Sequence, residues 1–474
     1  MQKVVVFLGL LALTACAGSQ KAAHLDLIYE KSAKTDRPDR NPVIVIPGIL
    51  GSRLKDQETE TLVWGAFTRG AADPQDPAGA RLISLPVEGD KDLSELRDDV
   101  QPDGVLETIQ IDILGIPIEL QAYAGIMSTL GAGGYRDESL GLAGAVDYGE
   151  DHYTCFQYAF DWRRSNAENA AVLFNFIKQR RIEVQAAYKN YFEIDDADVN
   201  FDIVAHSMGG LVTRYMLRYG DQKLPSDGSL PALTWAGAQY VNKVILVGTP
   251  NGGSADALLD LVNGRDIGRP FLPYYQPALM GTFVSVYELL PRARHGYVFF
   301  DGDKSKPVED LFDPALWRRM KWGLVDPRQD EVLKNLMPLV TDPKERKERA
   351  GALLTRILHE AKSFARALDV PAKAPEGLEI ILVAGDATPT SKDISIDSST
   401  GKLSVVGLGD GDGTVLRTSV LMDEREGGEW QPYVQSPIDY QSVMFLPDDH
   451  LGLTKSIVFQ DNVLYWLLEA PLKD

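Results

Sequence analysis

The stretch "FDIVAHSMGG", residues 201–210, joins an apolar run to a serine that is followed by a methionine and two glycines. Its first half is typical of a short buried strand, whereas "LVTRYMLRYG" (211–220) gathers its apolar residues on one side of a helix. Ser207 is therefore predicted on a sharp turn between strand and helix, which can present a nucleophilic hydroxyl at the end of a sheet. Ala205 and Gly209, two residues before and after the serine, are small enough for strand and helix to pass closely, although Ala205 stands where this pattern usually has glycine.

Apolar runs closed by turn residues recur along the chain and alternate with helical patterns. An α/β fold follows, with a mostly parallel central sheet and helices on both faces. Ser165 and Glu168 have the spacing of a capping box before a long helix, and residues 456–470 predict a terminal helix. The strand candidates are "NPVIVIPG" (41–48), "VNKVILVG" (241–248), "LEIILVAG" (378–385) and "YQSVMFLP" (440–447).

The length and the charge of the chain limit the classes of function that it can have. The chain has 474 residues, 44% of them hydrophobic, which is enough for a large buried core. It carries 48 Lys and Arg against 68 Asp and Glu, a formal net charge of −20. Binding to nucleic acid is therefore not expected, because such binding depends on basic groups that neutralise phosphates.

The first residues, "MQKVVVFLGLLALTAC" (1–16), have one lysine, a short apolar run and then small residues, as in a secretory signal peptide. The ending "LTAC" resembles the bacterial lipobox, which implies cleavage of residues 1–15 and a lipid anchor on Cys16. The alternative is an ordinary cleaved signal peptide that contains a cysteine. The lipobox interpretation predicts a protein of the cell envelope that is located at the bacterial outer membrane. It also predicts a linker over residues 16–40.

Residues 41–474 are predicted to form one catalytic domain with two insertions. Residues 54–105 are polar and lack sustained periodicity, and residues 252–375 are mostly helical but irregular. Both follow predicted strands, where ligands bind in open α/β sheets. We interpret them as a lid-like insertion and a helical cap, with decorative loops as the alternative, and we expect a solvated helix over residues 341–368.

The order serine, acid, histidine along the chain selects partners for Ser207. Of the six histidines, His450 lies in a turn after the last predicted strand, whereas His359 lies among charges on a predicted helix. The glycine-rich turn "LGDGDGTV" (408–415) offers Asp410 and Asp412 as the acid, with Asp386 as a competitor directly after a strand. That turn does not fit a calcium loop, because Val415 and Leu421 stand where an EF-hand requires glycine and glutamate.

Two backbone N–H groups are needed to stabilise the oxyanion of an acyl-transfer intermediate. Met208, directly after the serine, supplies one, and Ile49 in "VIPGILGS" (45–52), at the tip of an early strand, is the candidate for the other. No metal or organic cofactor is implied. Cys155, the only cysteine besides Cys16, is expected to be a buried apolar filler.

Several motifs, in this order, resemble the lecithin:cholesterol acyltransferase family. They span about residues 42–452 and are "PVIVIPGILGSRL" (42–54), Trp64, "FDWR" (160–163), "AHSMGG" (205–210), "VGTPNGGS" (247–254), "SVYELLP" (285–291), "GDGDGTV" (409–415) and His450. The resemblance implies an α/β-hydrolase fold with a membrane-binding cap and a lid. It places the nucleophile on Ser207, the acid on Asp412, the base on His450, the oxyanion amides on Ile49 and Met208, and the lid tryptophan on Trp64.

The function that this resemblance implies is a serine-dependent lipid acyl hydrolase or acyltransferase. A fatty acyl ester, with phospholipid as the expected donor, would be cleaved through an acyl-enzyme, and the acyl group passed to an alcohol or to water. The chain lacks the cysteines that hold the lid of vertebrate members, and a sterol acceptor does not transfer to a bacterial lipoprotein. The alternatives are an esterase for small soluble esters and a catalytically silent, lipid-binding envelope lipoprotein.

Overall fold

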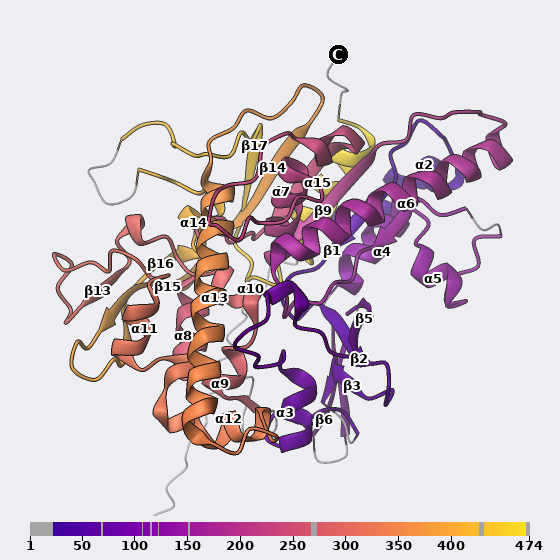
Figure 1. Cartoon of the computed structure of the whole chain (residues 1–474). Helices are drawn as coiled ribbons and strands as arrows, with labels where there is room; N and C mark the ends of the chain where they lie inside the picture. The colour runs from indigo at the N-terminus through magenta and orange to yellow at the C-terminus, as the bar shows by residue number, and fades with distance from the viewer. Residues whose placement is uncertain are drawn as a thin grey trace, which may run out of the picture.

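The computed structural model describes residues 22–67, 70–106, 108–113, 116–121, 123–149, 152–266, 273–425 and 431–470. Within them, the largest sheet has six strands, and all neighbouring strands are parallel (Figure 1). This arrangement confirms the predicted parallel sheet. Five of the six strands lie within the apolar runs that predicted them, whereas the strand over Cys155–Gln157 was not predicted. In spatial order the strands are β17 (Ser442–Leu446), β14 (Glu379–Gly385), β10 (Val241–Val247), β9 (Phe201–His206), β1 (Val43–Ile46) and β8 (Cys155–Gln157).

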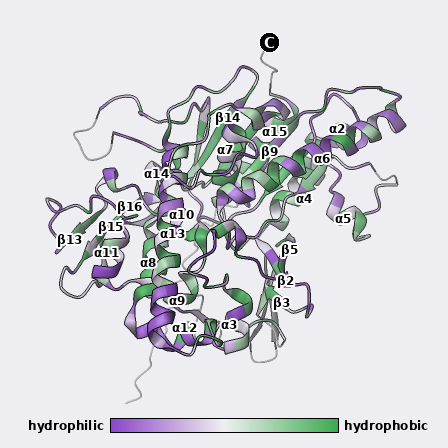
Figure 2. Cartoon of the chain, viewed as in Figure 1, coloured by the Kyte–Doolittle hydropathy of each residue, from purple (hydrophilic) through white to green (hydrophobic). Residues whose placement is uncertain are grey.

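The sheet is apolar on both faces, and its central strands are accordingly hydrophobic in Figure 2. Along β1, Ile44 and Ile46 join one core cluster, whereas Val43 and Val45 join the other. Successive side chains of a strand point to opposite faces, so an uninterrupted apolar run is what a sheet covered on both sides requires.

Helices cover both faces. α6 (Asn166–Phe192), α7 (Met208–Tyr219) and α13 (Pro343–Asp369) contribute to the larger core cluster, and α4 (Ala124–Ala132) and α15 (Ile457–Leu468) to the smaller one on the opposite face. The predicted terminal helix is α15. The smaller face also receives α1 (Leu25–Ile28) and α2 (Glu30–Lys34), which lie in the region predicted to be a linker.

Residues 22–40 are held against the domain by side-chain contacts. The hydroxyl of Tyr29, which is buried, donates to Glu469 at 2.8 Å, and that of Ser32 donates to the carbonyl of Gly133 at 2.9 Å. The guanidinium of Arg40 donates to the carbonyl of Gly134 at 3.0 Å. The described part of the predicted linker is therefore helical and docked. Residues 1–21, with the predicted signal peptide and Cys16, lie outside the described residues.

The two predicted insertions have folded cores. Within residues 54–105, β2 (Ser52–Asp56), β3 (Leu62–Trp64) and β5 (Val100–Val105) form an antiparallel sheet beside α3 (Pro77–Ile83). β4 (Ala66–Phe67) pairs in parallel with β6 (Thr108–Ile113). β6 in turn forms an antiparallel hairpin with β7 (Ile116–Gln121). Whether this region moves as a lid stays a prediction.

Residues 252–375 are mostly helical, as predicted. The helix expected to be solvated is α13, and it is amphipathic: Leu353, Leu354 and Ile357 are buried, whereas His359 is exposed. The prediction of a solvated helix was therefore wrong for the buried, apolar face of α13. The other elements are α8 (Ala255–Asn263), β11 (Arg265–Asp266), β12 (Tyr274–Tyr275), α9 (Pro277–Met280), α10 (Val284–Glu288), β13 (Val298–Phe300), α11 (Pro314–Met320) and α12 (Asp330–Leu336).

A third small sheet links this insertion to the acid turn. An antiparallel hairpin forms from β15 (Thr388–Ile396) and β16 (Leu403–Gly411), and β13 pairs with β15. The hairpin therefore lies in a separate sheet and not at the edge of the central one. The remaining helices are α5 (Glu138–Leu142) and α14 (Arg417–Leu421).

The start of α6 differs from the predicted capping box. The Ser165 hydroxyl accepts from the amide of Ala167 at 3.3 Å, as expected of an N-cap. Glu168, however, accepts from Arg164 at 3.0 Å, and the carboxylate of Glu288 on α10 takes the reciprocal place. It accepts from the amide of Asn166 at 2.7 Å and from the Ser165 hydroxyl at 2.8 Å. The cap is therefore tertiary, because its acid comes from another helix.

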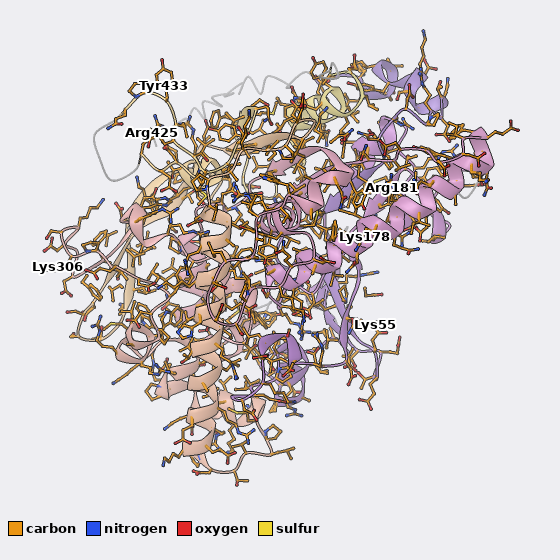
Figure 3. The ribbon with its side chains drawn as sticks, turned by 45° about the horizontal axis from the view of Figure 1, so that its top comes forward. Lys55, Lys178, Arg181, Lys306, Arg425 and Tyr433 are labelled. Atoms are coloured by element: carbon orange, nitrogen blue, oxygen red, sulfur yellow. The ribbon has the colours of Figure 1, made fainter. Side chains whose placement is uncertain are left out.

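The basic side chains labelled in Figure 3 come from several parts of the molecule, two of them from α6, and each is paired with an acid. Lys178 and Arg181 on α6 lie within 4 Å of carboxylate oxygens, as do Lys55, Lys306 and Arg425 elsewhere. The pairing of these basic groups with acids agrees with the excess of acidic residues that gives the chain a formal net charge of −20. Among the described residues, no helix is long and apolar enough to cross a membrane.

Candidate active site

Ser207 lies on the turn between β9 and α7. Its backbone has φ 54° and ψ −128°, a conformation that L-residues rarely adopt, and its amide donates to the carbonyl of Val247 at 2.7 Å. A Cβ on Gly209 would lie 2.3 Å from the carbonyl oxygen of Pro47, so a larger residue does not fit there. Ala205 is fully buried. The predicted strand–turn–helix geometry around the serine is therefore present.

His450, chosen from chain order, and Asp412, the acid that the family resemblance implies, meet Ser207 at the carboxyl ends of the central strands. Nε2 of His450 lies 2.9 Å from the Ser207 hydroxyl oxygen, and Nδ1 lies 2.7 Å from Oδ2 of Asp412. With a neutral imidazole, Nδ1–H donates to the carboxylate and the serine hydroxyl donates to Nε2. This arrangement can transfer the serine proton to the imidazole while the carboxylate holds the ring.

Asp412 is held in place by several hydrogen bonds. Its other oxygen accepts from the amides of Val415 at 2.7 Å and Thr414 at 3.0 Å. Burial acts to raise the pKa of Asp412, but the hydrogen bond from His450 and these amides outweigh it and lower the pKa. The carboxylate is thus ionised at neutral pH. The amide of His450 also donates to the carbonyl of Asp412 at 2.9 Å, so backbone and side chain are both fixed.

The structure separates the three acid candidates. Asp412 is buried and contacts His450, whereas Asp410 is exposed on β16 opposite Pro389 of the hairpin. Asp386 is partly exposed after β14, and its amide donates to the carbonyl of Leu446. Gly385, directly before it, leaves room for the acid turn, because a Cβ there would lie 2.5 Å from Cβ of Asp412.

The predicted oxyanion amides lie on two turns beside the serine. Met208 is the first residue of α7, where helical N–H groups have no partner within the helix. Ile49 follows β1 in a tight turn, closed by a 3.1 Å bond from the amide of Gly51 to the carbonyl of Gly48. The amides of Ile49 and Met208 donate to no acceptor among the described residues. Both can therefore receive a developing oxyanion.

A cavity of about 350 Å³ opens beside Ser207 and His450. The cavity is mostly apolar, as pockets for small molecules usually are. Its volume lies near the lower end of the range for small-molecule sites. Its apolar and aromatic lining includes Ile49, Leu50, Trp64, Leu106, Trp162, Tyr275, Met280, Phe283, Val286, Leu289, Val415 and Leu451.

Trp64, the predicted lid residue, is a buried part of this wall. It ends β3, its indole N–H donates to the carbonyl of Leu50 at 2.7 Å, and its ring meets Trp162 and Tyr275 edge to face. The ring therefore lines the cavity in a fixed orientation. Its part in a moving lid stays a prediction.

Polar residues that sequence reasoning did not single out also line the cavity. Asp256 and Asp260 lie on α8, and Asp260 is paired with Arg265 at 2.5 Å. Burial raises the pKa of Asp256. Tyr123 and His206 lie beside the serine as well. His206 directly precedes Ser207 and could have been noticed, whereas nothing in the sequence around Tyr123 connects it with the site.

Two further features bear on the chemistry. Among the described residues, no group of three or more His, Cys, Asp or Glu side chains is placed to hold a metal ion. Cys155 is buried on β8 as predicted, and burial raises the pKa of its thiol well above the usual value, so it is not a nucleophile at neutral pH.

Comparison with known proteins adds family and fold. The family model described as lecithin:cholesterol acyltransferase matches residues 144–322, a range that contains Ser207 but neither Asp412 nor His450. No protein with a curated description matches the sequence.

Similar solved structures include the Tle4–Tli4 complex, at 15% identity, 90% coverage of this chain, 98% of the other and a TM-score of 0.54. Lipase 1 from Pelosinus fermentans matches at 14% identity, 91% and 99% coverage and a TM-score of 0.35, and no argument rests on it. At such identities the likeness bears on the fold alone. The chain thus has an α/β-hydrolase fold, and its resemblance to the lecithin:cholesterol acyltransferase family is confirmed over residues 144–322.

Proposed function

We propose that this protein is a serine-dependent lipid acyl hydrolase or acyltransferase that cleaves a fatty acyl ester, with phospholipid as donor, through an acyl-enzyme. The observation that carries the proposal is the unbroken hydrogen-bonded line from Asp412 through His450 to Ser207, which ends at a mostly apolar cavity. The family match and the α/β-hydrolase fold support it at a coarse level.

In the proposed first half-reaction, His450 takes the proton of Ser207 while the serine oxygen attacks the ester carbonyl. The amides of Ile49 and Met208 donate to the oxyanion of the tetrahedral intermediate. His450 then gives its proton to the leaving alcohol of the lyso-lipid, and the acyl group remains on Ser207.

In the second half-reaction, an acceptor alcohol or water enters and His450 removes its proton as it attacks the acyl-enzyme. The tetrahedral intermediate collapses to release the new ester or the free fatty acid, and the proton returns to Ser207. Asp412 stays ionised throughout and stabilises the positive charge on the imidazole. Which acceptor prevails depends on how far the cavity walls exclude water.

The test compares wild type with Ser207→Ala on radiolabelled phospholipid, with and without an added alcohol. We expect the variant to fold but to lose turnover by at least ~10³-fold, because the triad acts as a unit. Labelling of wild type by a fluorophosphonate, and not of the variant, would locate the nucleophile. Normal turnover by Ser207→Ala would refute the proposal, and turnover of short soluble esters alone would favour the small-ester alternative.

We further propose that Cys16 carries a lipid anchor that holds the enzyme in the bacterial envelope. Cys16→Ser should retain activity on detergent-dispersed substrate but leave the membrane fraction, because anchoring rests on acyl chains worth ~0.8 kcal/mol per buried methylene. Fractionation of cells that express each form, followed by a salt wash, measures this. Retention of the variant in the washed membranes would contradict the anchor.

A further inference from the structure

A second hydrogen-bonded line runs beside the catalytic one and joins segments that are far apart in the sequence. The amide of Gly48 donates to the hydroxyl oxygen of Tyr123 at 2.8 Å, and that oxygen lies 2.9 Å from Nδ1 of His206. Nε2 of His206 lies 2.9 Å from the backbone carbonyl of His450. The line therefore begins at the residue before Ile49 and ends on the backbone of His450.

The direction of every hydrogen in this line is fixed by its two ends. A backbone amide can only donate and a carbonyl can only accept, so the Tyr123 hydroxyl receives from Gly48 and donates to Nδ1 of His206. The hydrogen of the neutral ring is then on Nε2, where it donates to His450. Burial, and next the neighbouring imidazole of His450, lower the pKa of His206 to about 3, so the ring is neutral in this role.

Both side chains of the line are buried, and only its last bond, to the backbone of His450, is part-buried. Tyr123 and His206 are each 3% exposed, and their rings meet edge to face at 5.6 Å. The rings of His206 and His450 lie 4.8 Å apart. A buried polar group left without a partner costs free energy, so the four groups favour one relative placement of the two turns.

We propose that Tyr123 and His206 are positioning residues that hold the turn bearing the Ile49 amide at a fixed distance from His450. The proposal rests on the proposed function, because the two turns carry the oxyanion donor and the base of that reaction. Ser207 lies between them, so an error in either turn would misplace a group that acts on the same substrate carbonyl. Neither residue takes a proton from the substrate or gives one to it.

The first experiment uses detergent-solubilised full-length protein with phosphatidylcholine in mixed micelles. Competent sites are counted with a fluorophosphonate, and kcat per site and KM are measured for wild type and Tyr123→Phe. We expect kcat to fall about 10- to 100-fold with KM within about twofold, since misplacement near 1 Å costs rates of that order. The matched control is Tyr135→Phe, because the Tyr135 hydroxyl is also buried but has no partner among the described residues.

The second experiment tests whether the two residues act as one line. The double variant Tyr123→Phe, His206→Gln should lose no more kcat than the worse single variant, because cutting the line twice adds little. His206→Gln keeps an amide N–H that can reach the His450 carbonyl, so it should be less impaired than His206→Phe. Multiplicative losses in the double variant, or equal losses for Gln and Phe, would overturn the proposal.

Other outcomes also decide whether Tyr123 and His206 are positioning residues. Tyr123→Phe with kcat per site within twofold of wild type, or with a loss confined to the melting temperature or the number of titratable sites, would assign these residues a structural role only and overturn the proposal. Ser207→Ala separates the two claims. If it is inactive while Tyr123→Phe is normal, the positioning role fails alone, and if it remains active, the proposed function fails first.

Discussion

At the scale of single residues, the site combines a serine with a strained backbone and two hydrogen-bonded side chains, those of His450 and Asp412. The backbone of Ser207, at φ 54°, costs of the order of 1–3 kcal/mol, which the surrounding strand and helix must offset. The bond from its amide to Val247 and the tight passage of Gly209 past Pro47 hold that conformation. The backbone strain therefore lies at the residue that is proposed to react.

The choice of acid is tested by three amide substitutions. Asp412→Asn should lower kcat by about 10⁴-fold, because the amide favours the wrong tautomer of His450. Asp386→Asn and Asp410→Asn should change kcat far less, since neither residue contacts the imidazole in this structure. Kinetics with a soluble ester, after active-site titration, measure all three. A crippled Asp386→Asn would show that the acid has been misassigned.

At the scale of elements, the start of α6 depends on an acid from another helix. Glu288→Leu should lower the free energy of unfolding by about 1–3 kcal/mol, because it leaves the amide of Asn166 and the hydroxyl of Ser165 buried without their acceptor.

Glu288→Gln should cost less, because its single carbonyl oxygen still accepts one of the two hydrogen bonds. Glu168→Gln, which alters the residue expected in the local box, should also cost little. Denaturant unfolding followed by circular dichroism compares the three variants. A loss for Glu168→Gln larger than that for Glu288→Leu would restore the local capping box.

The sequence was sufficient for features that are local or depend on chain order. The apolar runs predicted the strands because a covered parallel sheet needs both faces apolar, and the turn after β9 pointed to Ser207. Chain order led to His450 and left Asp386, Asp410 and Asp412 as acids, and the family resemblance then pointed to Asp412.

Contacts between distant segments could not be predicted in this way. Glu288 lies 122 positions from Asn166, and Tyr123 lies 75 from Gly48, and no periodicity records such pairs. The buried face of α13 was missed for a related reason, because its charges dominate the sequence while its apolar residues meet partners from other elements. The assignment of roles to the site residues stays a prediction until the variants are measured.

At the scale of the whole molecule, one buried carboxyl links stability to pH. Asp202 lies on β9, is 3% exposed and accepts from the side chain of Asn41 at 3.2 Å. Burial raises its pKa to about 6, although Lys243 and Asn41 act to lower it. The folded state therefore binds this proton more tightly than the unfolded chain, whose aspartates titrate near ~3.9. The contribution of Asp202 to stability is full below that value and is lost as the pH rises through about 6.

Asp202→Asn removes this titration while keeping an oxygen for Asn41. Relative to wild type, the variant should gain stability from about pH 4 to pH 6 and then keep a constant advantage of about 3 kcal/mol. Urea unfolding of both proteins at pH 4, 5, 6, 7 and 8 measures the difference. An advantage that shrinks as the pH rises would contradict the assigned direction.

The pairing of β13 with β15 limits how this protein can be divided. β13 belongs to the helical insertion, whereas β15 and β16 lead directly into the turn of Asp412, and Thr388 on β15 bridges to that residue. The insertion is thus built into the support of the acid. A shortened protein without β13 would leave β15 as an open edge, able to pair with another chain. The smallest unit that keeps β15 paired on both sides beside the acid turn therefore includes this part of the insertion, which sets a lower bound on how far the chain can be shortened.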